Sequence, residues 1–138
     1  MKVLLLTPSP PHLHMGGYAT VARYREGLQQ CGHLCEVFGG TSEGGLKQSL
    51  EGTLGRFKPD IVHAHDAWRT GVSLLGCRTP WVVSLSGEDV HDDMLVDGRG
   101  ALVCEVVKRA HRVLVPSEAA VRLVEERVPD AVGKLDVV

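Results

Sequence analysis

Several features that mark particular classes of protein are scarce or missing in this sequence of 138 residues. Aromatic residues make up only 4% of it, too few for the stacking platforms on which nucleic-acid-binding proteins place bases. The net charge of −2 at pH 7 leaves no basic excess for the phosphates of a nucleic acid. No apolar run approaches the roughly 18 residues of a membrane-spanning helix. These absences predict a protein with no nucleic-acid partner and no transmembrane segment.

Closely spaced cysteine pairs are also missing. The four cysteines form no C-x-x-C pair, and we expect them to be buried, reduced thiols: Cys31, Cys35, Cys77 and Cys104. Residues 1–7 could pass for the start of a signal peptide, but their apolar stretch is short and prolines follow at once. A strand that opens a sheet explains this segment better. Together these features predict a cytoplasmic protein in a reducing compartment.

What the sequence does contain is a regular alternation of two patterns, with enough hydrophobic residues (43%) to bury a core. Apolar, β-rich runs predict strands over 3–7, 34–38, 61–65, 81–85, 112–115 and 135–138. Segments of helical period predict helices over 18–31, 46–57, 67–76, 97–110 and after Ser117. This alternation is typical of a parallel sheet with helices on both faces. The predicted fold class is therefore α/β, a Rossmann-like three-layer α/β/α domain spanning residues 1–138.

The first strand is apolar almost throughout, which suits a strand buried on both faces. We expect it in the middle of the sheet, flanked by the strands at 34–38 and 81–85, with the strand at 61–65 further out. In the helix over 97–110, Leu102 should face the core. A polar loop is expected at 86–93.

The loops after the strands hold the candidate site, because ligands of such sheets bind beyond the carboxyl ends of the strands. The first loop ends in Gly16 and Gly17 at a helix start, where backbone N–H groups attract an anion such as a diphosphate. A plain turn that needs glycine is the alternative. G-x-G-x-x-G is absent after the first strand, and no acidic residue closes the second, which argues against NAD.

Two further loops carry histidines and carboxylates. His63, His65 and Asp66 leave the third strand, and alternation places the two histidines on one side of the sheet. They could bind zinc, but no matching third ligand is evident, so a cleft role for His65 or Asp66 is the better interpretation. The segment from Ser86 to Asp89 follows the fourth strand, and its carboxylates could orient sugar hydroxyls. A solvated acidic turn is the alternative.

The order of these segments is similar to that of a known family. The segments are K-V-L-L-L-T-P at 2–8, K-P-D-I-V-H-A-H-D at 58–66, P-W-V-V-S-L-S-G-E-D-V at 80–90, A-H-R-V at 110–113 with P-S-E at 116–118, and G-K-L-D-V-V at 133–138. With the glycine pair, they resemble the amino-terminal half of GT-B glycosyltransferases, in particular the retaining family four (glycosyl transferases group 1). The third segment fits that family's P-x-V-x-T-x-H-G-x-D pattern. The resemblance covers the whole chain.

The resemblance implies an enzyme of two Rossmann-like domains that transfers a hexosyl group from a nucleotide-sugar donor to an acceptor, without a cofactor and without a metal. This chain would be its acceptor-side domain, inactive alone because the carboxy-terminal donor domain is absent. Gly16 and Gly17 would face the donor diphosphate. The acceptor cleft would be lined by His14, His65, Asp66, Ser86, Gly87, Glu88 and Asp89. The family's histidine is Ser86 here, so the resemblance assigns no catalytic base.

The expected strand order places the glycines on the floor of this cleft and His65 and Asp66 on its rim. Two other functions stay open at this stage. One is a stand-alone flavodoxin-like module that binds a small anion. The other is a metal-dependent hydrolase that uses His63, His65, Asp66 and Asp89.

Overall fold

The computed structural model describes residues 1–9, 16–39 and 45–138, with only the backbone given for residues 16 and 45–48. The strands are β1 (Lys2–Thr7), β2 (Leu34–Gly39), β3 (Ile61–His65), β4 (Trp81–Ser84), β5 (Arg112–Val115) and β6 (Leu135–Val137). The α-helices are α1 (Gly16–Gln30), α2 (Gly45–Phe57), α3 (Gly87–His91), α4 (Arg99–Arg109) and α5 (Glu118–Arg127). Short 3-10 turns are η2 (Gly71–Leu74), η3 (Asp93–Leu95) and η4 (Pro129–Ala131).

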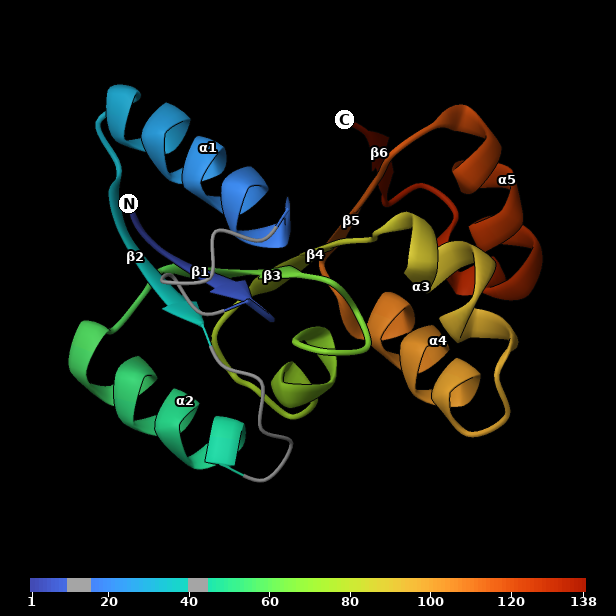
Figure 1. The fold of residues 1–138 in the computed structure, drawn as a ribbon, viewed down its shortest axis with the longest axis horizontal. Helices are drawn as coiled ribbons and strands as arrows, with labels where there is room; N and C mark the ends of the chain where they lie inside the picture. The colour runs from blue at the N-terminus through green and yellow to red at the C-terminus, as the bar shows by residue number, and fades with distance from the viewer. Residues whose placement is uncertain (10–15, 40–44) are drawn as a thin grey trace.

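The six strands form one parallel sheet in the order β2-β1-β3-β4-β5-β6, so the predicted Rossmann-like α/β class is confirmed (Figure 1). β1 lies inside the sheet beside β2, as expected. Its other neighbour is β3, not β4, and the predicted flanking by residues 81–85 is wrong. Beyond β1, the strands β3, β4, β5 and β6 follow one another in chain order, because each connection leads to the next strand on the same side. The loop after β3 therefore lies between those of β1 and β4, and the expected place of His65 and Asp66 on a rim is wrong.

The apolar side chains of β1 divide between two cores, because successive residues of a strand point to opposite faces. Val3 and Leu5 pack with Val21 of α1, which covers one face of β2, β1 and β3. Leu4 and Leu6 join a larger core on the other face, covered by α2, η2, α4 and α5 (Figure 1).

Several expectations need correction. The helix predicted over 67–76 is only the short turn η2, and the polar loop at 86–93 contains α3 and the start of η3. Leu102 is 38% exposed, since the buried face of α4 is made by Val103, Val106 and Val107. All four cysteines are free, but Cys31 is exposed and the other three are only partly buried.

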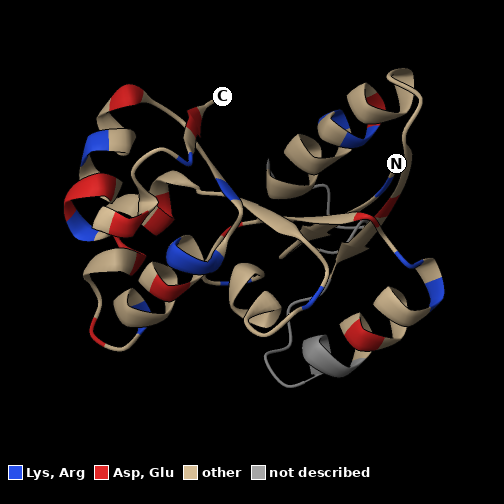
Figure 2. Ribbon diagram, turned by 180° about the vertical axis from the view of Figure 1, so that it is seen from behind, with Lys and Arg blue, Asp and Glu red and all other residues tan. Residues whose placement is uncertain are grey.

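Charged residues of both signs are interspersed over the helices, while the central strands carry few (Figure 2). The last strand of the sheet, β6, is held to β5 by an ion pair between Arg112 and Asp136 at 3.0 Å. Within the described ranges, no helix is both long and apolar enough to cross a membrane.

Two helical glycines provide a stability prediction. A Cβ on Gly100 would lie 2.5 Å from the backbone oxygen of Met94, whereas a Cβ on Gly55 would meet nothing within 4 Å. Gly100→Ala should therefore lower the free energy of unfolding by about 1–3 kcal/mol through a clash with backbone. Gly55→Ala should raise it by about 0.5–1 kcal/mol, since alanine favours helix. Urea denaturation of both variants checks this pair, and equal effects would contradict the packing of α4 against η3.

Candidate functional site at the carboxyl edge of the sheet

Three loops meet at the carboxyl edge of the sheet, after β1, β3 and β4. The first and second approach each other at Gly17, near the start of α1. A Cβ on Gly17 would lie 3.7 Å from Ser9 Oγ, 3.9 Å from His65 Cδ2 and 4.0 Å from Thr7 Oγ1. The backbone of α1's first turn is thus close to two hydroxyl groups and one imidazole. His14, one of the predicted cleft residues, lies outside the described residues.

The two histidines of β3 face the same side, as the alternation predicts, but their surroundings differ. His63 is buried, with Nε2 2.6 Å from Ser84 Oγ and its ring 5.2 Å from that of Tyr24 in α1. Burial, with a smaller contribution from neighbouring His65, lowers the pKa of His63 to about 4. His63 is therefore a neutral, packed histidine at neutral pH.

His65 is partly buried at the end of β3. Burial lowers its pKa, and the charge of Asp89 opposes that shift. Its Nδ1 is buried, and no group in the described part of the chain forms a hydrogen bond with it. His65 is thus a largely neutral imidazole whose buried Nδ1 has unused hydrogen-bonding capacity, while the Cδ2 edge of the ring lies beside Gly17.

Asp89 connects the loops after β3 and β4 and is fully buried. Its carboxylate accepts hydrogen bonds from the backbone N–H groups of Ala67 (3.1 Å), Trp68 (3.2 Å) and Ser86 (2.8 Å). The Ser86 hydroxyl also bonds to it, and in return accepts from the Asp89 N–H, which forms a capping box at the start of α3. Asp89 and Ser86 are therefore occupied within the protein, and Gly87 begins the helix that they cap.

Asp66 follows β3 in the left-handed region, with φ of 83°, an uncommon conformation that aspartate tolerates better than most residues. Its carboxylate accepts from the backbone N–H of Arg69 at 2.6 Å and pairs with the Arg69 guanidinium at 3.5 Å. Burial first, and then the nearby charge of Asp89, raises the pKa of Asp66 to about 7. Close to neutral pH, the buried carboxyl group of Asp66 is thus near its point of half-protonation.

Several residues in these loops had no signal in the sequence. Arg69 reaches from Asp66 to Glu88 on α3, with its Nη2 3.2 Å from the Glu88 carboxylate. The Thr70 hydroxyl donates to the backbone oxygens of His65 and Asp66, and so fixes the turn after β3. The pair between Arg69 and Glu88 joins two loops that are distant in the chain, so no local pattern indicates it.

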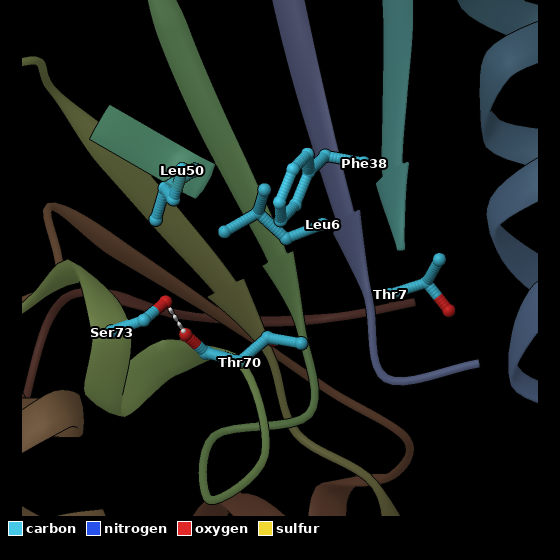
Figure 3. A pocket seen from close by; sticks show the side chains of 6 residues that line it. All are labelled: Leu6, Thr7, Phe38, Leu50, Thr70 and Ser73. Carbon is cyan, nitrogen blue, oxygen red and sulfur yellow. Dashed lines mark hydrogen bonds between the residues drawn. The ribbon is translucent and has the colours of Figure 1, made fainter. Parts of the chain in front are cut away.

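A separate hollow of about 160 Å³ lies near the carboxyl ends of β1 and β2. It is lined by Leu6, Thr7, Phe38, Leu50, Thr70 and Ser73. Figure 3 shows Leu6 and Phe38 side by side on paired strands, and the Ser73 hydroxyl donating to the backbone oxygen of Thr70. That volume includes open solvent, and the space between these side chains leaves no room for even a water molecule, so the hollow cannot hold a substrate.

Metal ligation finds no support in the described part of the chain. No group of three or more histidine, cysteine, aspartate or glutamate side chains there is arranged to hold a metal ion. His63 is instead bonded to Ser84, and Asp89 to backbone N–H groups. The hydrolase alternative therefore has no geometric basis among these residues.

Comparison with protein families gives one match. The model of the glycosyl transferase 4-like domain matches residues 7–138, which is nearly the whole chain. No curated protein matches the chain.

The raised pKa of Asp66 predicts a pH-dependent stability. The folded protein holds this proton up to about pH 7, whereas an unfolded aspartate loses it near pH 4. Relative to Asp66→Asn, the wild-type free energy of unfolding should therefore fall as the pH rises through this window, because the folded state must accommodate a buried charge. Asparagine tolerates the positive φ and keeps an acceptor for Arg69. Urea denaturation of both proteins between about pH 4 and 8 checks this, and a difference that does not vary with pH would contradict it.

Proposed function

The chain belongs to the family of glycosyl transferase 4-like domains, and from this premise we propose that it is the acceptor-side domain of an enzyme that transfers a sugar from a nucleotide-sugar to an acceptor. The proposal includes a retaining transfer of a hexosyl group in carbohydrate biosynthesis, as the sequence resemblance implies, and a cytoplasmic location, as the cysteine usage predicts. It also includes a second, donor-binding domain as the partner of this chain.

The observation that carries the proposal is the convergence of the first turn of α1 with Thr7, Ser9 and His65. A helix N-terminus offers backbone N–H groups that have no partner within the helix and an electrostatic field that favours anions. Hydroxyl groups and a neutral imidazole can donate further hydrogen bonds to the same anion. We propose that the diphosphate of the donor binds against Gly16 and Gly17, with His65 beside it.

The other candidate residues have distinct parts in this proposal. Asp89 and Ser86 position the loops after β3 and β4 and do not touch the substrate. Asp66 and Glu88 hold Arg69 at the acceptor side. The Ser86 hydroxyl is engaged in the capping box with Asp89, so we propose that the domain contributes to the rate by binding and orienting both substrates rather than by removing a proton.

The diphosphate part of the proposal is testable on the chain itself. Titration with uridine or guanosine diphosphate should shift the backbone amide resonances of Gly16 and Gly17 in an ¹⁵N-labelled sample. Few contacts offset the cost of association, so the dissociation constant should be about millimolar.

Gly17→Asp provides a matched test with Gly27→Asp. A Cβ on Gly17 would make only ordinary van der Waals contacts, the shortest at 3.7 Å, and a Cβ on Gly27, further along the same helix, would meet nothing within 4 Å. Gly17→Asp should abolish the shifts because it places a negative charge where the diphosphate binds, while Gly27→Asp should preserve them. Unchanged Gly16 and Gly17 resonances in the wild type at roughly tens of millimolar nucleotide would refute the proposed diphosphate site.

A second prediction concerns turnover. In an enzyme of two domains, the reacting atoms meet only between them, and positioning supplies much of the rate. The 138-residue chain alone should therefore transfer no sugar from any nucleotide-sugar in an assay of nucleoside diphosphate release. Release at rates of about 1 s⁻¹ or more would show that this chain holds a complete active site.

A further inference from the structure

Two arginines beside the candidate site are anchored by buried carboxylates and remain half exposed to solvent. Arg69 is 51% exposed and pairs with Asp66, whose side chain is 5% exposed. Arg99, at the start of α4, is 48% exposed and pairs at 3.2 Å with Asp93, whose side chain is 9% exposed. Each arginine is therefore paired with a buried carboxylate, while about half of its side chain stays exposed to solvent.

Trp68 connects the two arginines. It precedes Arg69 in the loop after β3, and its backbone N–H is fixed by the Asp89 carboxylate. The Arg99 guanidinium lies over the Trp68 ring, 5.1 Å from its centroid. The indole is partly buried against the main core, so it supports Arg99 as a rigid surface. Figure 1 shows the loop after β3 extending toward α4, where this contact forms.

Arg69, Glu88 and Arg99 offer hydrogen-bond donors and acceptors that suit the hydroxyl groups of a ligand. A hydroxyl both donates and accepts, so it suits a surface with a donor and an acceptor next to each other. The Arg69 guanidinium supplies donors and the adjacent Glu88 carboxylate, 59% exposed, supplies acceptors. Arg99 adds a second planar set of donors, which suits paired oxygens, and the Trp68 indole beneath it holds that guanidinium group in place.

Arginine binds both phosphorylated and neutral hydroxylated ligands, and the local charge favours the neutral ones. The carboxyl groups of Asp66, Glu88, Asp89 and Asp93 surround the two guanidinium groups, and burial lowers the pKa of neighbouring His65 so that it adds little positive charge. Burial raises the pKa of both Asp66 and Asp89, so the charge of these six groups ranges from negative, when both are ionised, to neutral, when both are protonated, and is never positive. A phosphorylated ligand would meet repulsion here, whereas a neutral one would not.

We propose that Trp68, Arg69, Glu88 and Arg99 form an acceptor subsite for a neutral, polyhydroxylated ring such as an unphosphorylated sugar. The inference rests on the proposed function, since it names the acceptor class of the same edge of the sheet. It separates the two anchored arginines from the start of α1, where the anionic donor group binds.

The test uses the ¹⁵N-labelled 138-residue chain and two probes at matched ionic strength, methyl α-glucoside and glucose 6-phosphate. The side-chain N–H resonances of Trp68, Arg69 and Arg99 report on the subsite, and the indole of Trp81, only 3% exposed, is the internal control. The glucoside should shift the reporter resonances with a dissociation constant of about 10 mM. Glucose 6-phosphate should bind there at least about threefold more weakly.

Arg99→Lys and Arg109→Lys form a matched pair on α4. Arg109 is also exposed and paired with a carboxylate, Glu105 at 2.7 Å, but it lies at the other end of the helix. Arg99→Lys keeps the charge and loses the planar fork, so it should weaken glucoside binding about fivefold, whereas Arg109→Lys should leave binding unchanged. Glu88→Gln should reduce the penalty against glucose 6-phosphate, because it removes one of the opposing charges.

Three results would overturn the inference. They are the absence of Trp68 and Arg99 shifts at roughly 100 mM glucoside, tighter binding of glucose 6-phosphate than of glucoside at these resonances, and equal effects of the two arginine variants. Denaturation curves of the variants establish that each is folded. The Gly17 amide response to nucleoside diphosphate is recorded on the same sample. If that response is intact while the glucoside fails to bind, only the acceptor subsite is refuted; if it is lost, the proposed function is refuted.

Discussion

The loops of the candidate site depend on one buried carboxylate. Asp89 accepts hydrogen bonds from backbone N–H groups of two loops, after β3 and after β4, and it caps the short helix α3 at the same time. A buried carboxylate is costly unless its oxygens are satisfied, and here the satisfying donors are backbone groups that would otherwise lack partners. The same hydrogen bonds therefore offset the desolvation of the Asp89 carboxylate and the loss of conformational entropy in the two loops. Trp68 owes its position to this arrangement.

The electrostatics of the site follow from that burial. Burial of the Asp66 carboxyl group, and then the nearby charge of Asp89, raises the pKa of Asp66. The arginines that approach these carboxyl groups come from the surface and stay half exposed, because only one side of each guanidinium is needed for the ion pair. Buried acids in the loops thus determine where the exposed bases lie. The buried carboxyl groups therefore determine where the exposed guanidinium groups face a ligand.

The sequence allowed much of the fold to be predicted, for reasons visible in particular strands. Apolar runs such as 3–7 and 112–115 are local signals, so the strands and the α/β class were found correctly. The neighbour of β1 was predicted wrongly because β3 and β4 are both short, buried strands that local patterns do not distinguish. The approach of Gly17 to His65 follows from parallel strands delivering their loops to one edge. The contact of Arg99 with Trp68, by contrast, depends on how α4 packs, and no spacing in the sequence indicates it.

The ion pair between Arg112 and Asp136 has a consequence for how the molecules behave toward one another. It joins β5 to β6, the last strand in the sheet order, whose backbone N–H and C=O groups pair with no further strand in the part of the chain that the structure describes. Open edges of this kind are templates for aggregation, and charged side chains along them oppose it, because a second chain would have to desolvate those charges in order to add a strand. β6 is also only three residues long, which limits the bonds that an incoming strand could gain. This edge of the sheet is in this way a poor template for the addition of a strand from a second molecule.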